Sequence, residues 1–154
     1  MLALGMMIGD GRPAYRVEIN ANRNQWDLLN DAPQVANLGY AINLSIVIGP
    51  GVTVQSDTLG YDALAIRSLY SGSSVYLINR GVIRGYDSNT PNFTTAVYHL
   101  ASGCGLFIDN SSGYIYAGYM AGSSSYGYAV RYSADSSFNW LSGSTRIAGT
   151  VYQG

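Results

Sequence analysis

The sequence contains one histidine, His99, and one cysteine, Cys104, residue types that often supply a general base, a nucleophile or a metal ligand. A catalytic triad also needs a group that orients the base, and a structural zinc site needs four ligands. A single His–Cys pair supplies neither, and no GxGxxG, P-loop, HExxH or CxxC pattern occurs. We therefore expect His99 to be a strand residue that faces solvent or a neighbouring coil. Cys104, between Gly103 and Gly105, is expected to be a small buried residue.

Paired carboxylates are the other chemistry that the residue types allow. Glycoside hydrolysis needs two carboxylates held roughly 5–9 Å apart. Asp57 and Asp62 flank one turn, and Asp87 and Asp109 are spaced to fall one coil apart on the same edge. These residues stand among Ser, Thr, Asn and Gly, where Asp usually hydrogen-bonds to the backbone of its own turn. No dense run of acids supplies the six or more oxygens that calcium requires. We predict structural aspartates, no enzyme activity, no metal and no cofactor.

Tyrosine is the most informative residue type in the chain. Twelve of the 14 tyrosines follow residue 60, and Tyr offers a large, rigid contact area with a polar tip at low entropic cost. Arg and Trp are the other side chains that dominate binding surfaces. The candidate binding surface comprises Tyr114, Tyr116, Tyr119, Tyr126, Tyr128, Tyr132, Arg131 and Trp140. An alternative, compatible with this one, is a ladder of tyrosines that stack on adjacent coils and stabilise the fold itself.

The composition indicates an all-β protein. The 154 residues include 19 glycines, no lysine and a single glutamate, Glu18. Lys and Glu normally fill the exposed faces of helices, whereas Gly, Tyr, Ser, Asn and Thr are typical of strands and turns. A net charge of −1 provides no electrostatic attraction to nucleic acid or to an anionic membrane. A single cysteine cannot form an internal disulfide.

A repeat of about 32 residues organises most of the chain. Ile83, Ile115 and Ile147 occupy equivalent places, 32 residues apart. Matching strands lie before and after each of them, so each repeat contains three short strands separated by Gly, Ser, Asn and Asp. One coil of a triangular β-solenoid requires three such strands. We predict a β-solenoid (β-helix) of about four irregular coils, with Leu77, Ile83 and Ile115 facing inward. The alternative is a β-sandwich or jelly roll, which also has many short strands.

The residues before the repeat are expected to close its first coil. Tyr15–Ile19 alternates apolar and polar residues, as a half-buried strand does. Asn24–Asp31 places Trp26 and the adjacent leucines on one face, which predicts a short capping helix with Asn22 or Asn24 as its N-cap. The predicted organisation is an arm in residues 1–14 and a single β-rich domain in residues 15–154, with the strand and capping helix in 15–33 and the coils in 42–154.

The two ends of the chain are expected to contact other surfaces. The apolar start of the arm, Met1–Ile8, is too short to span a bilayer, so we predict that it packs on its own domain or on a neighbouring subunit. No cap is visible after the last coil, and open strand edges favour association. We predict a cyclic homotrimer, because closed symmetry buries such edges.

The order of the segments is a strand, an Asn-rich turn with a short helix, a strand–Gly–Val–strand, and a Leu-Ile-Asn-x-Gly-x-Ile-x-Gly signature. They are Val17–Asn22, Trp26–Leu29, Ile46–Val54, Ala63–Leu64 and Leu77–Gly85. This order, over about half the chain, resembles a Gly-turned β-coil module of bacteriophage tail-tip and tail-fibre structural proteins. Relatives often continue with a glycine-rich tract, whereas Tyr86–Pro91 leads here into further strands, so the role of that tract is not carried over.

The resemblance implies a virion protein of a tailed bacteriophage. The expected function is that of a tail-tip or tail-fibre component involved in binding the host surface. A capsid decoration (cement) protein is the alternative, and a polysaccharide-cleaving tailspike is a third interpretation with less support. The expected partners are further copies of the chain in a homotrimer, other virion proteins, and a glycan or protein of the host surface. Neither nucleic acid nor membrane insertion is expected.

Overall fold

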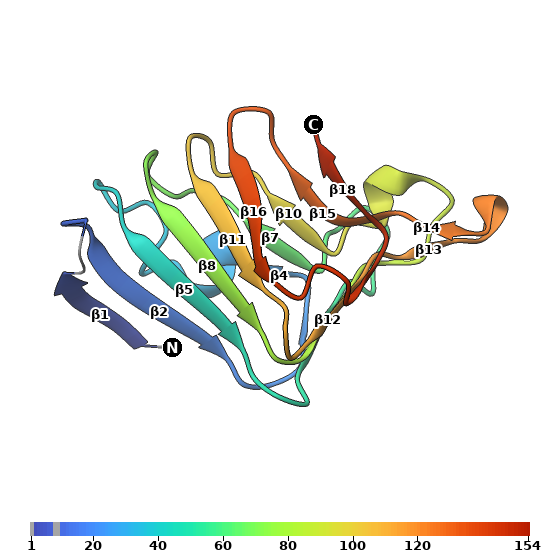
Figure 1. Cartoon of the computed structure of the whole chain (residues 1–154), viewed down its shortest axis with the longest axis horizontal. Coiled ribbons are helices and arrows are strands. Elements are labelled where there is room, and N and C mark those ends of the chain that lie inside the picture. The colour runs from blue at the N-terminus through green and yellow to red at the C-terminus, as the bar shows by residue number, and fades with distance from the viewer. Residues whose placement is uncertain (1, 8–9) are drawn as a thin grey trace.

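The computed structural model describes residues 2–7 and 10–154, which form a β-solenoid (Figure 1). Each coil adds one strand to each of three sheets, here called A, B and C. Sheet A holds β2 (Pro13–Ile19), β5 (Asn43–Ile48), β8 (Ser74–Asn79), β11 (Gly105–Asp109) and β16 (Ser137–Ser142). Sheet B holds β3 (Arg23–Asn24), β6 (Thr53–Gln55), β9 (Val82–Arg84), β12 (Tyr114–Tyr116) and β17 (Ile147–Ala148). Sheet C holds β4 (Trp26–Asp27), β7 (Leu64–Ile66), β10 (Val97–His99), β15 (Tyr128–Tyr132) and β18 (Thr150–Gln153).

The 32-residue repeat of the sequence sets the register in which successive coils pair. Ile83 pairs with Ile115, and Ile115 pairs with Ile147, through the parallel strands of sheet B. Leu77, Ile83 and Ile115 are fully buried inside the solenoid, as predicted. Burying a side chain of this size contributes roughly 1.5–3 kcal/mol. The prediction of an all-β solenoid with four coils after residue 42 is confirmed, and parallel pairing between successive repeats replaces the alternative of a sandwich or jelly roll.

The N-terminal segment is a further coil, and the predicted helix is wrong in its extent. Strands β2, β3 and β4 pair in parallel with β5, β6 and β7. Gln25 has a positive φ of 47°, which turns the chain between β3 and β4 where a helix was expected. The helix α1 covers only Leu28–Asp31, and its N-cap is Asp27, which accepts a hydrogen bond from the Leu29 N–H at 2.9 Å, rather than Asn22 or Asn24.

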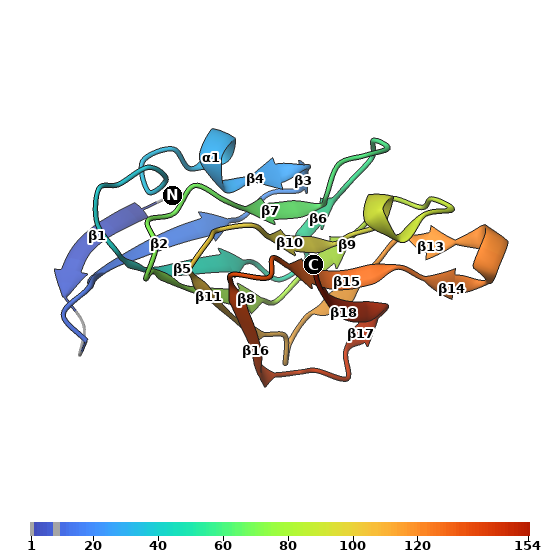
Figure 2. The same cartoon turned by 90° about the horizontal axis from the view of Figure 1, so that it is seen from above.

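The two ends of the stack differ in how well they are covered (Figure 2). At one end α1 lies beside β4, and Leu28, Ala32 and Val35 are buried in the core. Strand β1 (Leu2–Met7) pairs antiparallel with the edge of β2, so this part of the arm lies on its own domain. At the other end Phe138 and Trp140 face the direction of the core but are only partly buried. The most exposed apolar residues of that last coil are Leu141, Val151 and Tyr152.

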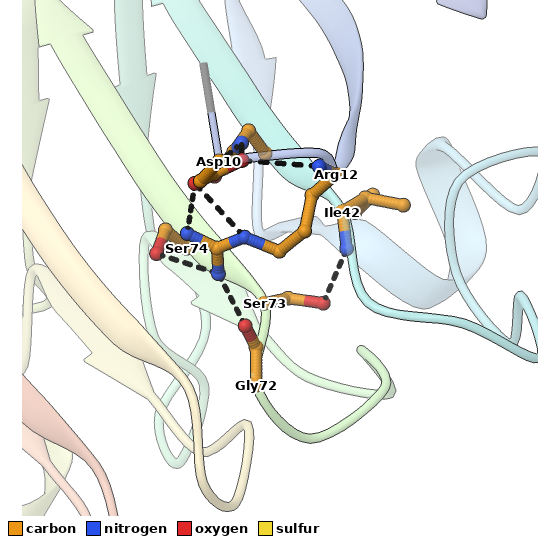
Figure 3. A network of polar contacts seen from close by, with 7 residues as sticks. Asp10, Arg12, Ile42, Gly72, Ser73 and Ser74 are labelled. Carbon is orange, nitrogen blue, oxygen red and sulfur yellow. Dashed lines mark hydrogen bonds and ion pairs between the residues drawn. The ribbon is translucent and has the colours of Figure 1, made fainter. Parts of the chain in front are cut away.

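The last residues of the arm are tied to the solenoid by a polar network (Figure 3). Arg12 donates to the Gly72 carbonyl and, at 3.2 Å, to Ser74 Oγ, while Asn43 donates to Asp10 Oδ1 at 2.9 Å. The Arg12 guanidinium and backbone N–H also bond to Asp10, which lowers the pKa of that carboxyl from 3.8 to about 2. These contacts join three coils through one short segment.

A buried asparagine pair holds the corner between sheets A and B. The Asn79 amide donates to Asn110 Oδ1 at 2.8 Å, and Asn79 Oδ1 accepts from the Gly81 N–H at 3.1 Å. Asn110 donates in turn to the Arg146 carbonyl at 2.8 Å and the Gly143 carbonyl at 3.3 Å. Both side chains are buried, so each satisfies backbone groups that water cannot reach.

We predict that Asn110→Ala destabilises the protein by about 1–3 kcal/mol, because it leaves buried donors and acceptors without partners. Urea unfolding followed by circular dichroism measures the change. The matched control is Asn139→Ala on the exposed face of β16, for which we expect less than about 0.5 kcal/mol. Equal effects of the two substitutions would contradict the assigned role of the buried pair.

Candidate functional site: an aromatic corner and its groove

Three long loops project side by side from the corner where sheet B passes into sheet C (Figures 1 and 2). They are residues 56–63, 85–96 and 117–127, and we call them together the B–C corner. The same corner is a single residue in the first coil, Gln25, and in the last coil, Gly149. The loops contain the 3₁₀ helix η1 (Pro91–Phe93) and the hairpin β13 (Tyr119–Met120) and β14 (Ser125–Tyr126), which is closed by η2 (Ala121–Ser123).

Hydrogen bonds join the second and third of these loops. The Tyr119 N–H donates to Asp87 Oδ1 at 2.8 Å, and the Gly122 N–H donates to Asn89 Oδ1 at 3.3 Å. The Gly118 N–H donates to the Thr94 carbonyl at 2.7 Å. The first loop is held at its base, where Asp57 accepts from the side chains of Asn24, at 3.0 Å, and Gln25. Because their bases are bonded to the stack, these loops are positioned by the solenoid.

The B–C corner carries a set of exposed apolar side chains. The Tyr119 and Tyr126 rings meet edge to face, with their centroids 5.2 Å apart. The full set is Leu59, Tyr61, Phe93, Tyr119 and Tyr126, each between 39% and 60% exposed. Aromatic side chains held on ordered backbone are the usual anchors of binding surfaces. The sequence pattern pointed to Tyr119 and Tyr126 but not to Leu59, Tyr61 and Phe93.

The predicted binding surface does not form one continuous face. Tyr114 and Tyr116 stack on the outer face of sheet B, with ring centroids 5.7 Å apart. Tyr128 and Arg131 lie on sheet C, where Tyr128 stacks on Tyr152 at 4.5 Å. The remaining predicted residues, Tyr132 and Trp140, both contact Phe138 beside the exposed last coil. The structure thus distributes the candidates over two sheets, the B–C corner and one end of the stack.

Part of the tyrosine excess serves the stack itself. Tyr76 and Phe107 are paired residues of adjacent coils, and their rings stack at 5.2 Å. The Arg131 guanidinium lies 4.5 Å from the centroid of the Tyr98 ring, and Tyr98 is its neighbour in the adjacent coil. Ring stacks and cation–π contacts of this kind contribute about 0.5–1.5 kcal/mol each. Tyr76 and Tyr98 therefore stack on residues of adjacent coils, as the ladder interpretation predicted. The exposed tyrosines of the B–C corner do not belong to this ladder.

A groove of about 250 Å³ lies on sheet C, beside the first loop of the B–C corner. Its lining consists of Gln25, Trp26, Asp27, Gly60, Tyr61, Asp62, Ala65, Arg67, Tyr98 and Leu100. Asp27 is engaged: Arg67 Nε donates to its two oxygens at 3.0 and 2.9 Å, and the Leu29 N–H donates to it as well. Asp62 differs from the other turn aspartates, because burial raises the pKa of its carboxyl from 3.8 to about 6.

The other three candidate aspartates are structural. Asp57 joins the first loop to the first coil, and Asp109 accepts from Ser111 and Ser142 hydroxyls at 2.7 and 2.6 Å. The sequence spacing predicted that Asp87 and Asp109 lie on the same edge of the solenoid, and this prediction is wrong. Asp87 follows β9 at the B–C corner, whereas Asp109 ends β11 at the corner between sheets A and B. The 32-residue period places residues along the stack but does not reveal which corner they occupy.

The only histidine lies inside the solenoid rather than at its surface. His99 is fully buried, and its Nε2–H donates to the Cys104 carbonyl at 3.0 Å. Nδ1 has no hydrogen-bond partner among the described residues. Desolvation lowers the pKa of His99 and raises the pKa of the buried Cys104 thiol, so both are neutral near pH 7. Among residues 2–7 and 10–154, no group of three or more His, Cys, Asp or Glu side chains is arranged to hold a metal ion.

The fold and this corner define a β-solenoid with a loop-built, aromatic surface. Comparison of the chain with protein-family models, with curated proteins and with solved structures gives no match. In the part of the chain that the structure describes, no helix has the length and apolar character needed to cross a membrane.

We predict that acid destabilises the fold through His99. Its pKa is lowered in the folded state, so protons bind preferentially to the unfolded chain. The contribution of neutral His99 to folding stability is complete above the ordinary histidine pKa of 6.5. It is lost as the pH falls below that value, by at most about 1.4 kcal/mol per pH unit. Urea unfolding at pH 7.5, 6.0 and 5.0 should show a shallower acid loss for His99→Gln, which keeps a donor for the Cys104 carbonyl. Parallel pH profiles for the two proteins would refute this role.

Asp62 is predicted to have the opposite effect on the pH dependence of folding stability: its contribution improves as the pH falls. Its raised pKa means that the ionised carboxylate is disfavoured in the fold, so its cost is complete above about pH 6 and disappears as the pH falls toward 3.8. Asp62→Asn should stabilise the protein at pH 8 by about 1–2 kcal/mol, after allowance for the remaining solvent contact. The gain should vanish at pH 3.5, as measured by urea unfolding. A variant less stable than the parent at pH 8 would contradict the assigned burial.

Proposed function

We propose that the protein is a structural component of the virion of a tailed bacteriophage, at the tail tip or in a tail fibre, and that it binds the host surface through the B–C corner. The phage assignment rests on the sequence resemblance over Val17–Asp87. The binding assignment rests on one observation above the others: five exposed apolar side chains sit on three adjacent loops of an otherwise regular stack.

The architecture suits adhesion for a physical reason. Association is opposed by the entropy lost when loops and side chains become ordered at an interface. Tyr119 and Tyr126 already contact each other, and hydrogen bonds from the Tyr119 N–H to Asp87 and from the Gly118 N–H to the Thr94 carbonyl tie their loop to the neighbouring loop. Less entropy is therefore lost on binding than with three independent loops. Length changes in these loops also leave the strands beneath them in register, so such a surface is compatible with many different targets.

Capsid decoration is the second candidate, and the last coil is the observation that favours it. Phe138, Trp140 and Val151 face the direction of the core without a further coil above them. A decoration protein needs a flat, self-complementary or capsid-facing surface, and the open end of a solenoid has unpaired strand edges of that kind. The same end is available for the homotrimer predicted from the sequence, which stays a proposal here.

Polysaccharide cleavage has weaker support. Asp27 and Asp62 line one groove, as a pair of catalytic carboxylates would. However, both oxygens of Asp27 already accept hydrogen bonds from Arg67, and one also accepts from Leu29. A nucleophile or general base needs a free lone pair directed at the substrate, so this pairing argues for binding rather than hydrolysis.

We predict that gold-labelled antibody against the purified chain marks the tail tip or fibres of intact virions in electron micrographs. Label spread over the head would instead support the decoration protein. Particles without label, together with absence of the chain from purified virions by mass spectrometry, would remove both candidates.

For the corner itself, Phe93→Ser combined with Tyr126→Ser should weaken binding of the chain to host cells by about tenfold or more, because truncating an aromatic anchor that an interface buries costs about 1–2 kcal/mol or more. The matched control is Tyr70→Ser, an equally exposed tyrosine in the turn between β7 and β8. Flow cytometry with labelled protein measures the binding. Equal binding by the parent, the double variant and the control would place the adhesive surface elsewhere.

A further inference from the structure

We propose that the groove on sheet C, lined in part by Tyr61, is a binding site for one uncharged saccharide unit. The inference rests on the proposed function only for the source of the ligand, a host-surface glycan, since the site itself is argued from the groove. The exposed corner and this groove share the loop of residues 56–63, so a bound glycan chain would extend from the groove across the corner.

The floor of the groove is a single row of outward-facing residues. Asp27 pairs with Ala65, Ala65 with Tyr98, and Tyr98 with Arg131, each from the next coil. Tyr152 ends the row beside Arg131. Ala65 is the small member of the row, and it leaves a depression between a carboxylate on one side and an aromatic ring on the other. The depression is therefore a consequence of one small side chain in a regular ladder.

Two tyrosines give the groove the shape that a sugar ring requires. Tyr98 stands on the floor, held from behind by the Arg131 guanidinium at 4.5 Å. Tyr61 lines the groove from the loop of residues 56–63 and is 60% exposed. The carbon-bound hydrogens of a pyranose face pack on an aromatic ring, which presents a broad apolar surface with a polar tip. A volume of about 250 Å³ is below the range of drug-sized sites and suits one ring rather than several.

The charges around the groove select a neutral polyol over an ion. Asp27, Asp62 and Arg67 line the groove, and Arg131 lies at the next place in the row, where its charge attracts that of Asp62. A cationic ligand would meet two guanidinium groups, and an anionic ligand would meet two carboxylates. Sugar hydroxyls both donate and accept, so a mixed set of acidic acceptors and basic donors satisfies them together. Because Arg67 engages Asp27, Asp62 is the carboxylate open to a ligand hydroxyl.

The environment of Asp62 adds a pH dependence. The groups that face it are Asp27, which repels its charge, Arg131, which attracts it, and the groove residues Arg67, Tyr61 and Tyr98. Its pKa is raised to about 6, chiefly by burial. A hydroxyl donated to a carboxylate forms a stronger hydrogen bond than one donated to a neutral acid. Saccharide affinity should therefore fall as the pH is lowered from 7.5 to 5.

Saturation-transfer NMR on the full-length chain tests the proposal. The probes are methyl glycosides of neutral hexoses and N-acetylhexosamines, with N-acetylneuraminic acid and choline as anionic and cationic comparisons. We expect transfer to at least one neutral glycoside and weaker transfer to both ions. Ala65→Leu should fill the depression and weaken binding about tenfold or more, whereas Ser45→Leu, on the outer face of sheet A, should leave it unchanged. Asp62→Asn should bind several-fold more weakly at pH 7.5 and lose the pH dependence.

No transfer to any neutral glycoside, a preference for either ion, or undiminished binding by Ala65→Leu would overturn the proposal. Unfolding curves for each variant separate lost binding from lost structure, and Asp62→Asn is expected to be at least as stable as the parent near neutral pH. The two levels of inference fail separately. Host-cell binding that persists in Ala65→Leu but not in the corner double variant would contradict a role of the groove in that binding and would support host binding through the B–C corner. Saccharide binding by a chain that is absent from virions would support the groove site and contradict the proposed virion function.

Discussion

Every feature of this protein depends on the in-register stacking of its coils. Parallel pairing satisfies the backbone of one coil with the backbone of the next, and this requires the corners to approach closely. A Cβ on Gly81 would lie 2.1 Å from the Val52 carbonyl oxygen, and one on Gly118 would lie 1.7 Å from that of Tyr86. Such contacts are impossible for any other residue, so glycine at these corners keeps the coils at strand-pairing distance. The buried Asn79–Asn110 pair satisfies the polar groups that this close approach encloses.

This constraint also determines where variation is allowed. Strands must keep their register and the interior must keep its apolar residues, so neither can be rebuilt to recognise a ligand. The B–C corner is different, because a loop inserted between β9 and β10 or between β12 and β15 leaves the strands on either side in register. Outward-facing residues are equally free, as the change from Ala65 to Tyr98 to Arg131 along one row of sheet C illustrates. Both surfaces proposed to bind ligands consist of residues that stacking leaves unconstrained.

The stack could be predicted well from the sequence because its signal is periodic. Ile83, Ile115 and Ile147 repeat at the interval that places them side by side, so the spacing of these isoleucines was enough to align the coils. The first coil was missed because β3 and β4 are two residues each, too short to show alternation, and a helix explained the same apolar residues. The binding surface was only partly predicted for a related reason. A 32-residue period says which residues are neighbours along the stack, but the corner or face that each occupies depends on turn geometry. Asp87 and Asp109 were therefore placed on one edge, and Tyr61 and Asp62 were not brought together with Tyr98.

The proposed saccharide groove illustrates how a regular scaffold could produce a specific site with few special residues. In a row where each coil contributes one outward side chain, sheet C presents a sequence of chemistries at strand spacing: a carboxylate, a gap, an aromatic ring, a guanidinium and a second ring. The proposed sugar ring would occupy the gap, between the carboxylate and the first aromatic ring. The parallel hydrogen bonds fix those spacings, so little entropy remains to be lost when a ligand binds. Affinity at the proposed site would then depend on the side chain at the gap and on the loop of residues 56–63 that lines it. A change at Ala65 would alter which ring fits, and a change in residues 56–63 would alter what lies above it, while the coils beneath remain the same.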